Sequence, residues 1–193
     1  PLCVFYKLNN FMKRSPSIKT LIKDLEPDEL REVILELSKL SPKNKQFLKL
    51  YLQSSDAVDL ESIVNEAKKK IHGHFYGRSM FPKVDLSNAR KAVNEYSKVL
   101  KEYPSQVADL KLYYVEVGTE ITNDFGDLNE GFYSSLESMF EGFCKQIKKY
   151  PVYFNQFEDR VHELQFACQN IGWGYCDVIN DLAFELEEAA QTN

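Results

Sequence analysis

Apolar residues recur every three or four positions along most of the chain, and this spacing constrains the fold more than any other feature. Such a repeat gathers apolar side chains on one face of an α-helix. No segment alternates apolar and polar residues for long, as a half-buried strand would. Prolines such as Pro27, Pro42, Pro104 and Pro151 stand where new helices are expected to begin. The sequence therefore predicts an all-α protein without a sheet.

The spacing predicts about nine helices with short connections. Short connections favour antiparallel neighbours, so we expect helical hairpins, either in a bundle or in a short array that resembles helical repeats. A chain of 193 residues, 44% of them hydrophobic, is long enough to bury a core. Its longest uncharged runs fall well short of the ~18 apolar residues of a membrane span, and no membrane contact is expected.

The segment from His72 to Lys83 interrupts the helical spacing with two glycines, one proline and three aromatic residues. It is expected to be a loop and a boundary between lobes. We expect a smaller basic lobe over residues 12–75 and a larger acidic, aromatic-rich lobe over residues 76–193. Residues 1–11 show no signal-peptide pattern, and we expect them to be a remnant of expression or an extended translation start.

Charge is divided unevenly along the chain. Residues 1–101 hold 19 basic and 12 acidic residues, whereas residues 102–193 hold 5 and 17. Three interpretations are open: attraction between the two parts of one chain, reciprocal pairing between chains, and contact of the basic part with nucleic acid. The last is disfavoured because the basic residues form no dense run. Residues 72–83 alone suggest a stacking platform for single strands, unless their aromatic residues fill the seam between lobes.

Acidic residues recur at helical spacing in two places, and each place is either a solvated helix face or a surface for a cation or a basic partner. The first stripe is Asp109, Glu116, Glu120 and Asp124, and the second is Asp177, Asp181, Glu185 and Glu188.

Motifs for catalysis are missing from the sequence. There is no phosphate-binding loop and no local nucleophile signature, and the chain has only three histidines. The four cysteines lack C-x-x-C spacing, so we expect reduced thiols and a cytoplasmic location. No catalytic, cofactor-binding or metal-binding residue is assigned, and no cofactor is expected.

A surface for a ligand or partner is predicted where two turns meet. The first turn, residues 123–127, concentrates Asn, Asp and Gly, and Asp127 with Glu130 resembles a capping box for the next helix. The second turn, residues 172–174, places the only tryptophan between two glycines. The larger lobe is expected to hold an aromatic core around Tyr114, Phe132, Phe140, Phe143, Phe157, Phe166 and Trp173. Alternatively to a binding surface, Trp173 fills this core and the acids only cap helices. The predicted surface comprises Glu116, Glu120, Asn123, Asp124, Asp127, Tyr133 and Trp173.

Four segments resemble signature regions of an uncharacterised bacterial all-helical family, a domain of unknown function. They are LKLYYVEVGTEITNDFGDLNEGFYSSLESMFE at 110–141, IGWGYCDVINDL at 171–182, KLSPKNKQFLKLYL at 39–52 and the FPK-x-DLS-x-A-x-KA pattern from residue 81. The resemblance covers about residues 12–186. It implies an all-α cytoplasmic protein and carries over no activity.

Two functions are compatible with these patterns. The preferred one is a non-catalytic helical interaction module that binds a protein partner or its own copy, because the charge is split and aromatic residues are abundant. The alternative is a small-molecule or metal-dependent enzyme that uses the acidic helix faces.

Overall fold

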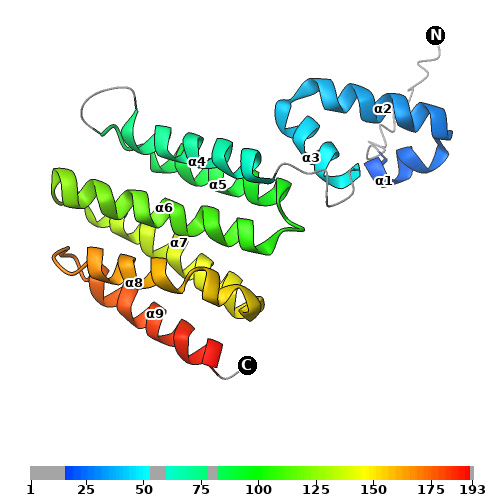
Figure 1. Cartoon of the computed structure of the whole chain (residues 1–193). Helices are drawn as coiled ribbons and strands as arrows, with labels where there is room; N and C mark the ends of the chain where they lie inside the picture. The colour runs from blue at the N-terminus through cyan, green and yellow to red at the C-terminus, as the bar shows by residue number, and fades with distance from the viewer. Residues whose placement is uncertain (1–15, 53–59, 78–81, 192–193) are drawn as a thin grey trace, which may run out of the picture. The chain divides into compact units, whose positions relative to one another are not determined.

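The computed structural model describes residues 16–52, 60–77 and 82–191, and every regular element within these ranges is helical (Figure 1). The predicted all-α fold without a sheet is therefore confirmed for the described residues. The elements are α1 Ile18–Leu21, η1 Ile22–Asp24, α2 Pro27–Leu40, α3 Pro42–Leu52, α4 Leu60–Tyr76, α5 Leu86–Val99, α6 Pro104–Phe125, α7 Glu130–Lys149, η3 Pro151–Gln156, α8 Glu158–Ala167 and α9 Tyr175–Gln191.

Local sequence signals explain where most of these helices begin. Pro27 and Pro104 occupy the first turn of α2 and α6, where a missing N–H group has no cost. Asp85 caps α5, because its side chain accepts a hydrogen bond from the backbone of Asn88 at 3.0 Å.

The start of α7 differs from the prediction. Asn129 caps this helix, because its side chain accepts a hydrogen bond from the backbone N–H of Phe132 at 3.1 Å. The proposed capping box of Asp127 and Glu130 is wrong, since the Asp127 carboxylate instead accepts a hydrogen bond from the Tyr133 hydroxyl at 2.8 Å.

The chain divides into two compact units, residues 1–48 and residues 49–193. Helix α4 belongs to the second unit, because it packs against α5 and α6. The loop predicted from His72 onward is wrong over its first part, since α4 continues through Tyr76. Gly73 has open space around it and Phe75 is fully buried, so this stretch keeps a helical core face despite its glycine. Residues 78–81 lie outside the described part.

The first unit contains α1, η1, α2 and the beginning of α3. None of its described residues is buried. Nine of its large apolar side chains keep at least 37% of their surface exposed. They are Ile18, Leu21, Ile22, Val33, Ile34, Leu35, Leu37, Leu40 and Phe47.

The second unit is an array of three helical hairpins, α4/α5, α6/α7 and α8/α9, which lie side by side in chain order (Figure 1). Helices α6 and α8 run in the same direction, because Glu116 contacts Arg160 and Asn123 contacts Ala167 one to two turns later in both. Such an arrangement follows from short connections within and between hairpins. The helical-repeat-like array is thus the form that the predicted hairpins take.

Aromatic side chains fill the core of this second unit. Its largest fully buried residues are Tyr96, Tyr114, Tyr133, Tyr175, Phe75, Phe132, Phe140 and Phe143. Two residues predicted for this core, Phe166 and Trp173, are instead 74% and 59% exposed. Phe166 lies on the outer face of α8 and Trp173 lies in a turn, so neither faces the neighbouring hairpin.

Candidate functional site

A groove of about 420 Å³ lies between α6 and α8. Four of the seven residues predicted as a ligand or partner surface line it. They are Glu116, Glu120, Asn123 and Asp124, all from α6. Helix α8 supplies the opposite wall with Arg160, Glu163, Leu164 and Ala167. The helical spacing of the acidic stripe explains this placement, because residues three and four apart share a face.

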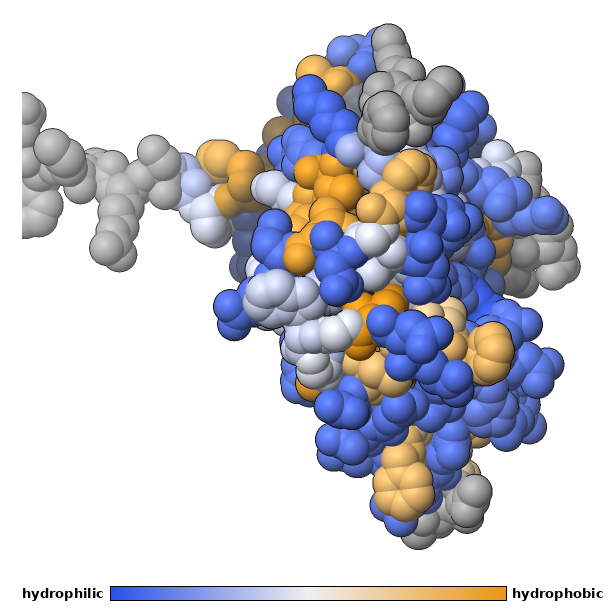
Figure 2. All heavy atoms as spheres, turned by 90° about the vertical axis from the view of Figure 1, so that its left-hand side faces the viewer, coloured by the Kyte–Doolittle hydropathy of each residue, from blue (hydrophilic) through white to orange (hydrophobic). Residues whose placement is uncertain are grey.

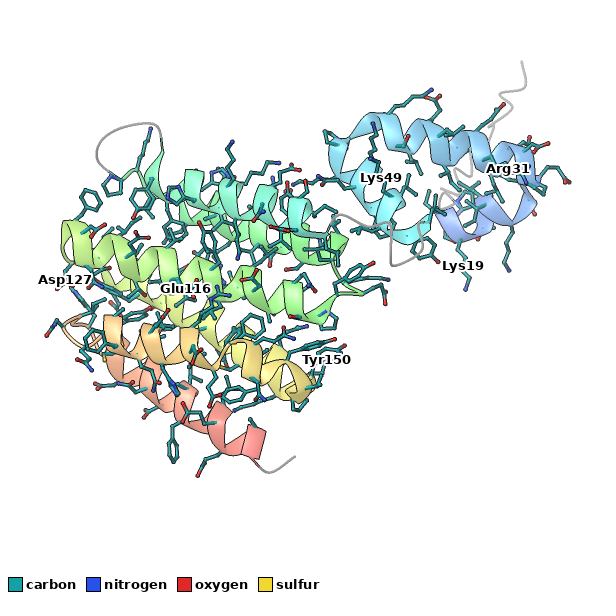
Figure 3. All side chains as sticks on the ribbon, viewed as in Figure 1. Lys19, Arg31, Lys49, Glu116, Asp127 and Tyr150 are labelled. Atoms are coloured by element: carbon teal, nitrogen blue, oxygen red, sulfur yellow. The ribbon has the colours of Figure 1, made fainter. Side chains whose placement is uncertain are left out.

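One end of the groove is closed by ion pairs. The Arg160 guanidinium donates two hydrogen bonds to the Glu116 carboxylate, at 2.8 and 2.7 Å, and a third to Asp109 at 2.6 Å. Lys68 of α4 reaches the second oxygen of Asp109 at 2.8 Å. Figure 3 shows Glu116 in the middle of α6, on the side that faces α8. These contacts tie α4, α6 and α8 together and neutralise two acids of the stripe.

Two neighbouring carboxylates stabilise the positive charge of Arg160. Burial alone would lower the pKa of Arg160, but the hydrogen bonds and charges of Glu116 and Asp109 outweigh burial and raise the pKa above its ordinary value. Its side chain is 28% exposed, so these charge-assisted bonds act in a partly desolvated setting. The cation therefore has a structural role and is committed to Glu116 and Asp109.

The other end of the groove is acidic and open. Glu120, Asp124 and Glu163 form no ion pair with any residue in the described ranges. The negative charge acts on Tyr76 of the neighbouring helix α4: burial raises the pKa of this phenol, and the charges of Glu120 and Asp124 raise it further. Burial raises the pKa of Tyr113 in the same way, with Glu120 as the next cause.

Aromatic rings of α4 meet the last residue of α6. Tyr76 stacks on His72 with ring centroids 4.4 Å apart and meets the edge of Phe125 at 6.4 Å. Phe125 ends α6 and is 46% exposed. Phe75, by contrast, is fully buried and cannot stack on a base, which removes one ring from the single-strand platform considered for residues 72–83. Figure 2 shows hydrophobic groups among hydrophilic ones on the face at the left of Figure 1.

The two predicted turns do meet. A side chain added to Gly172 would place its first carbon 3.8 Å from a carboxylate oxygen of Asp127. Asp127 lies at the end of the second unit in Figure 3. Trp173 follows with a φ of 62°, a left-handed conformation that residues other than glycine rarely adopt. The turn thus presents an exposed indole next to an exposed carboxylate.

Tyr133 has a different place from the one expected. Its ring is 1% exposed, so it forms no wall of the groove. Its hydroxyl donates to Asp127 at 2.8 Å and accepts the backbone N–H of Leu128 at 3.4 Å. Burial raises the pKa of Tyr133, and it therefore remains a neutral donor that fixes the Asp127 carboxylate. The spacing of Asp127 and Tyr133 in sequence gives no signal of this contact.

The described residues contain neither a metal-binding cluster nor a helix that could span a membrane. Within the described ranges, no group of three or more His, Cys, Asp and Glu side chains has a geometry that could hold a metal ion. The second acidic stripe is also partly neutralised, because Lys148 pairs with Glu185 at 3.0 Å. No described helix combines the length and the hydropathy that crossing a membrane requires.

The fold and groove define an all-α protein built from stacked helical hairpins, with an acidic groove along its second and third hairpins. This chain belongs to a family of unknown function, DUF6155, whose model matches residues 12–183. The match confirms the predicted membership of a domain-of-unknown-function family. No curated protein and no solved structure matches the chain.

Proposed function

We propose that this protein is a non-catalytic interaction module that binds a basic segment of a protein partner in the groove between α6 and α8. One observation carries the proposal: Glu120 and Asp124 lie without an ion-pair partner among the described residues, at the end of α6 where a negative charge is unfavourable. The helix dipole places partial negative charge at that end. Like charges four residues apart also repel.

These two carboxylates therefore do not stabilise the fold, unlike Glu116 one turn earlier, which binds Arg160. A lysine or arginine side chain in the groove would offset both unfavourable effects. The exposed rings of Phe125 and Trp173 add surfaces on which a cation or an aliphatic side-chain stem can pack. The apolar wall of Leu164 and Ala167 suits such a stem.

The test uses a fluorescein-labelled octalysine peptide, with labelled octaglutamate as the negative probe. Removing the two acids in Glu120→Gln/Asp124→Asn is expected to weaken octalysine binding by about 5-fold or more, since each ion pair between exposed groups contributes up to about 1 kcal/mol. The matched control is Asp177→Asn/Asp181→Asn, which removes the same charge from exposed positions of α9. It should change binding by less than about 2-fold.

Fluorescence anisotropy at two salt concentrations measures both pairs of variants. Equal weakening in the two pairs would mean that net charge alone attracts the peptide, and the groove would lose its role. The variants should also unfold no more easily than the native chain, because the lost charges lie at an unfavourable helix end.

The first unit supports self-association as a second candidate function. No described residue of this unit is buried, and Leu40 is 76% exposed. A unit of this size cannot bury a core of its own, and a second copy offers the same apolar face in an isologous contact. Residues 16–48 hold six basic and six acidic residues, so two copies of this unit do not repel each other.

The oligomeric state tests this second function. Light scattering over a concentration series should show dimers that Val33→Glu/Leu40→Glu converts to monomers. Val152→Glu is the matched control, because Val152 is 79% exposed in the second unit. A native chain that is monomeric at every concentration would exclude self-association.

A further inference from the structure

Two cysteines face each other where the third hairpin turns. Cys168 follows the last residue of α8, and Cys176 is the second residue of α9. Both are free thiols, and their sulfur atoms lie 3.0 Å apart. A disulfide bond needs about 2.05 Å, so the sulfur atoms need to approach by only about 1 Å. The turn that carries Trp173 lies between them.

The two thiols have different hydrogen-bond partners. The single thiol hydrogen of Cys168 lies within reach of two acceptors, the Cys176 sulfur at 3.0 Å and the Gln165 carbonyl oxygen at 3.2 Å. The Asn180 amide donates a hydrogen bond to the Cys176 sulfur at 3.4 Å, and Gln165 donates to the Asn180 oxygen at 3.2 Å and so orients that amide. These contacts hold the Cys176 sulfur in place beside Cys168.

The two cysteines also differ in solvent exposure. Cys168 is fully buried, whereas Cys176 is half-buried next to the exposed residues of the turn. Burial raises the pKa of the Cys168 thiol to about 12, and its hydrogen bond to Cys176 acts in the same sense. Cys176 is thus the sulfur that an external reagent meets first, and Cys168 is the neighbour that retains its proton.

We propose that Cys168 and Cys176 are an oxidation site that forms a reversible intramolecular disulfide on reaction with a hydroperoxide. In the first step the Cys176 thiolate attacks the peroxide, an S–O bond forms, the O–O bond breaks, and water leaves after protonation. In the second step the Cys168 sulfur attacks Cys176, the S–S bond forms and the S–O bond breaks. The released hydroxide takes the Cys168 proton. Two thiols and one hydrogen peroxide yield one disulfide and two waters.

Cys144 provides an internal control for this reaction. It is 2% exposed, and its sulfur contacts the carbonyl oxygen of Leu182 at 3.8 Å. Within the described ranges it forms no hydrogen bond to another cysteine. Burial raises the pKa of Cys144 to about 12, as for Cys168. A reagent that oxidised thiols without regard to their pairing would therefore treat Cys144 and Cys168 alike.

The experiment uses the full chain with Cys3→Ser, reduced and then treated with hydrogen peroxide. Remaining thiols are alkylated, and the products are digested with trypsin. Residues 161–193 contain no Lys or Arg, so trypsin leaves Cys168 and Cys176 on one peptide. That peptide is expected to lose about 2 Da and to carry no alkyl group, while Cys144 remains alkylated. Reduction with dithiothreitol should restore two alkyl groups.

Three further measurements make the result decisive. In Cys168→Ser, peroxide should leave a sulfenic acid on Cys176 that dimedone traps, with no loss of 2 Da. In Cys176→Ser, Cys168 should remain as alkylatable as Cys144. In urea, bond formation should slow by at least about 10-fold, because the fold holds the sulfur atoms together.

Two results would overturn the proposal. One is equal survival of all three thiols at a peroxide dose that oxidises a free cysteine. The other is a disulfide that forms as fast in urea as in the folded chain, since the eight-residue spacing alone would then explain it. Neither result would bear on the groove between α6 and α8, because octalysine binding is measured on the reduced protein.

Discussion

Apolar residues have the same helical spacing in the two units, but they are buried in the second unit and exposed in the first. In the second unit, apolar faces of α4 to α9 meet in successive hairpins and bury a continuous core that includes eight large aromatic residues. In the first unit, α2 has an equally clear apolar face, yet Val33, Ile34 and Leu37 are all at least 38% exposed. Amphipathic spacing therefore specifies a helix and a face, but only a stacked neighbour supplies what that face packs against.

Size accounts for much of this difference. Each hairpin of the array has a neighbouring hairpin to cover it, as in repeat proteins whose units are stable only together. The first unit has fewer than 50 residues, and below that length a single core rarely suffices. The two units therefore expose different surfaces, an apolar helix face in the first and an acidic groove in the second.

The largest expected effect comes from matched leucine truncations in the two units. Leu112→Ala in α6 removes a side chain with no exposed surface and should lower the free energy of unfolding by about 3 kcal/mol. Leu40→Ala at the end of α2 should lower it by less than about 0.5 kcal/mol in a dilute monomer. Urea denaturation followed by circular dichroism measures both. A large, concentration-dependent loss for Leu40→Ala would instead place a second copy on this face.

Two glycines of the second unit test how closely its helices pack. A side-chain carbon added at Gly118 would lie 2.4 Å from Leu136 of α7, so Gly118→Ala should destabilise the protein by about 2 kcal/mol despite its better helix propensity. Gly73 in α4 has nothing within 4 Å, and Gly73→Ala should stabilise by about 0.5–1 kcal/mol. Melting temperatures should therefore move in opposite directions. Equal shifts would contradict the close approach of α6 and α7.

Alkaline pH should destabilise the second unit. Burial raises the pKa of Cys144 to about 12, and burial likewise raises the pKa of Tyr175 and Tyr96. Above about pH 9 the unfolded chain releases these protons before the folded chain does, so stability falls as pH rises. The stability is fully present below that pH. The expected slope is about 1.4 kcal/mol per pH unit for each group in its window.

The described residues of the first unit, 16–48, contain no Tyr or Cys and contribute nothing to this slope. Denaturation midpoints at pH 7, 9 and 10.5 measure it, and Cys144→Ala should make it shallower. An unchanged midpoint at pH 10.5 would mean that these groups are not desolvated in the folded protein.

The sequence was a sufficient guide to the helices because their signals are local. Periodicity, Pro27 and Pro104 at helix starts, and the cap at Asp85 each depend on residues a few positions apart. The interruption after His72 misled for the same reason: Gly73 looks like a break, but the buried face of Ile71 and Phe75 keeps α4 helical. Tertiary packing outweighs local propensity there.

Only the residues of the candidate site that lie on a single helix could be predicted from the sequence. Helical spacing places Glu116, Glu120 and Asp124 on one face, and the structure lines a groove with them. Arg160 could not be found in this way, because it comes from α8 and meets Glu116 only after the hairpins stack. The exposure of Trp173 depends equally on how the third hairpin turns.

The smallest expected effect compares two apolar residues that are almost equally exposed, Trp173 at 59% and Leu35 at 60%. Trp173→Gly relieves a left-handed backbone conformation, φ 62°, and loses little buried surface. It should stabilise the fold by less than about 1 kcal/mol, since glycine also gains entropy in the unfolded chain. Leu35→Gly in the interior of α2 should destabilise by about 1 kcal/mol, because glycine is a poor helix former. Thermal unfolding measures both changes, and opposite signs are expected.

Destabilisation by Trp173→Gly would show that the indole packs on the second unit, and such an indole would be less able to contact a partner. If Trp173→Gly stabilises the fold and also weakens octalysine binding, the tryptophan is retained at a cost to stability, as expected of a residue that serves binding.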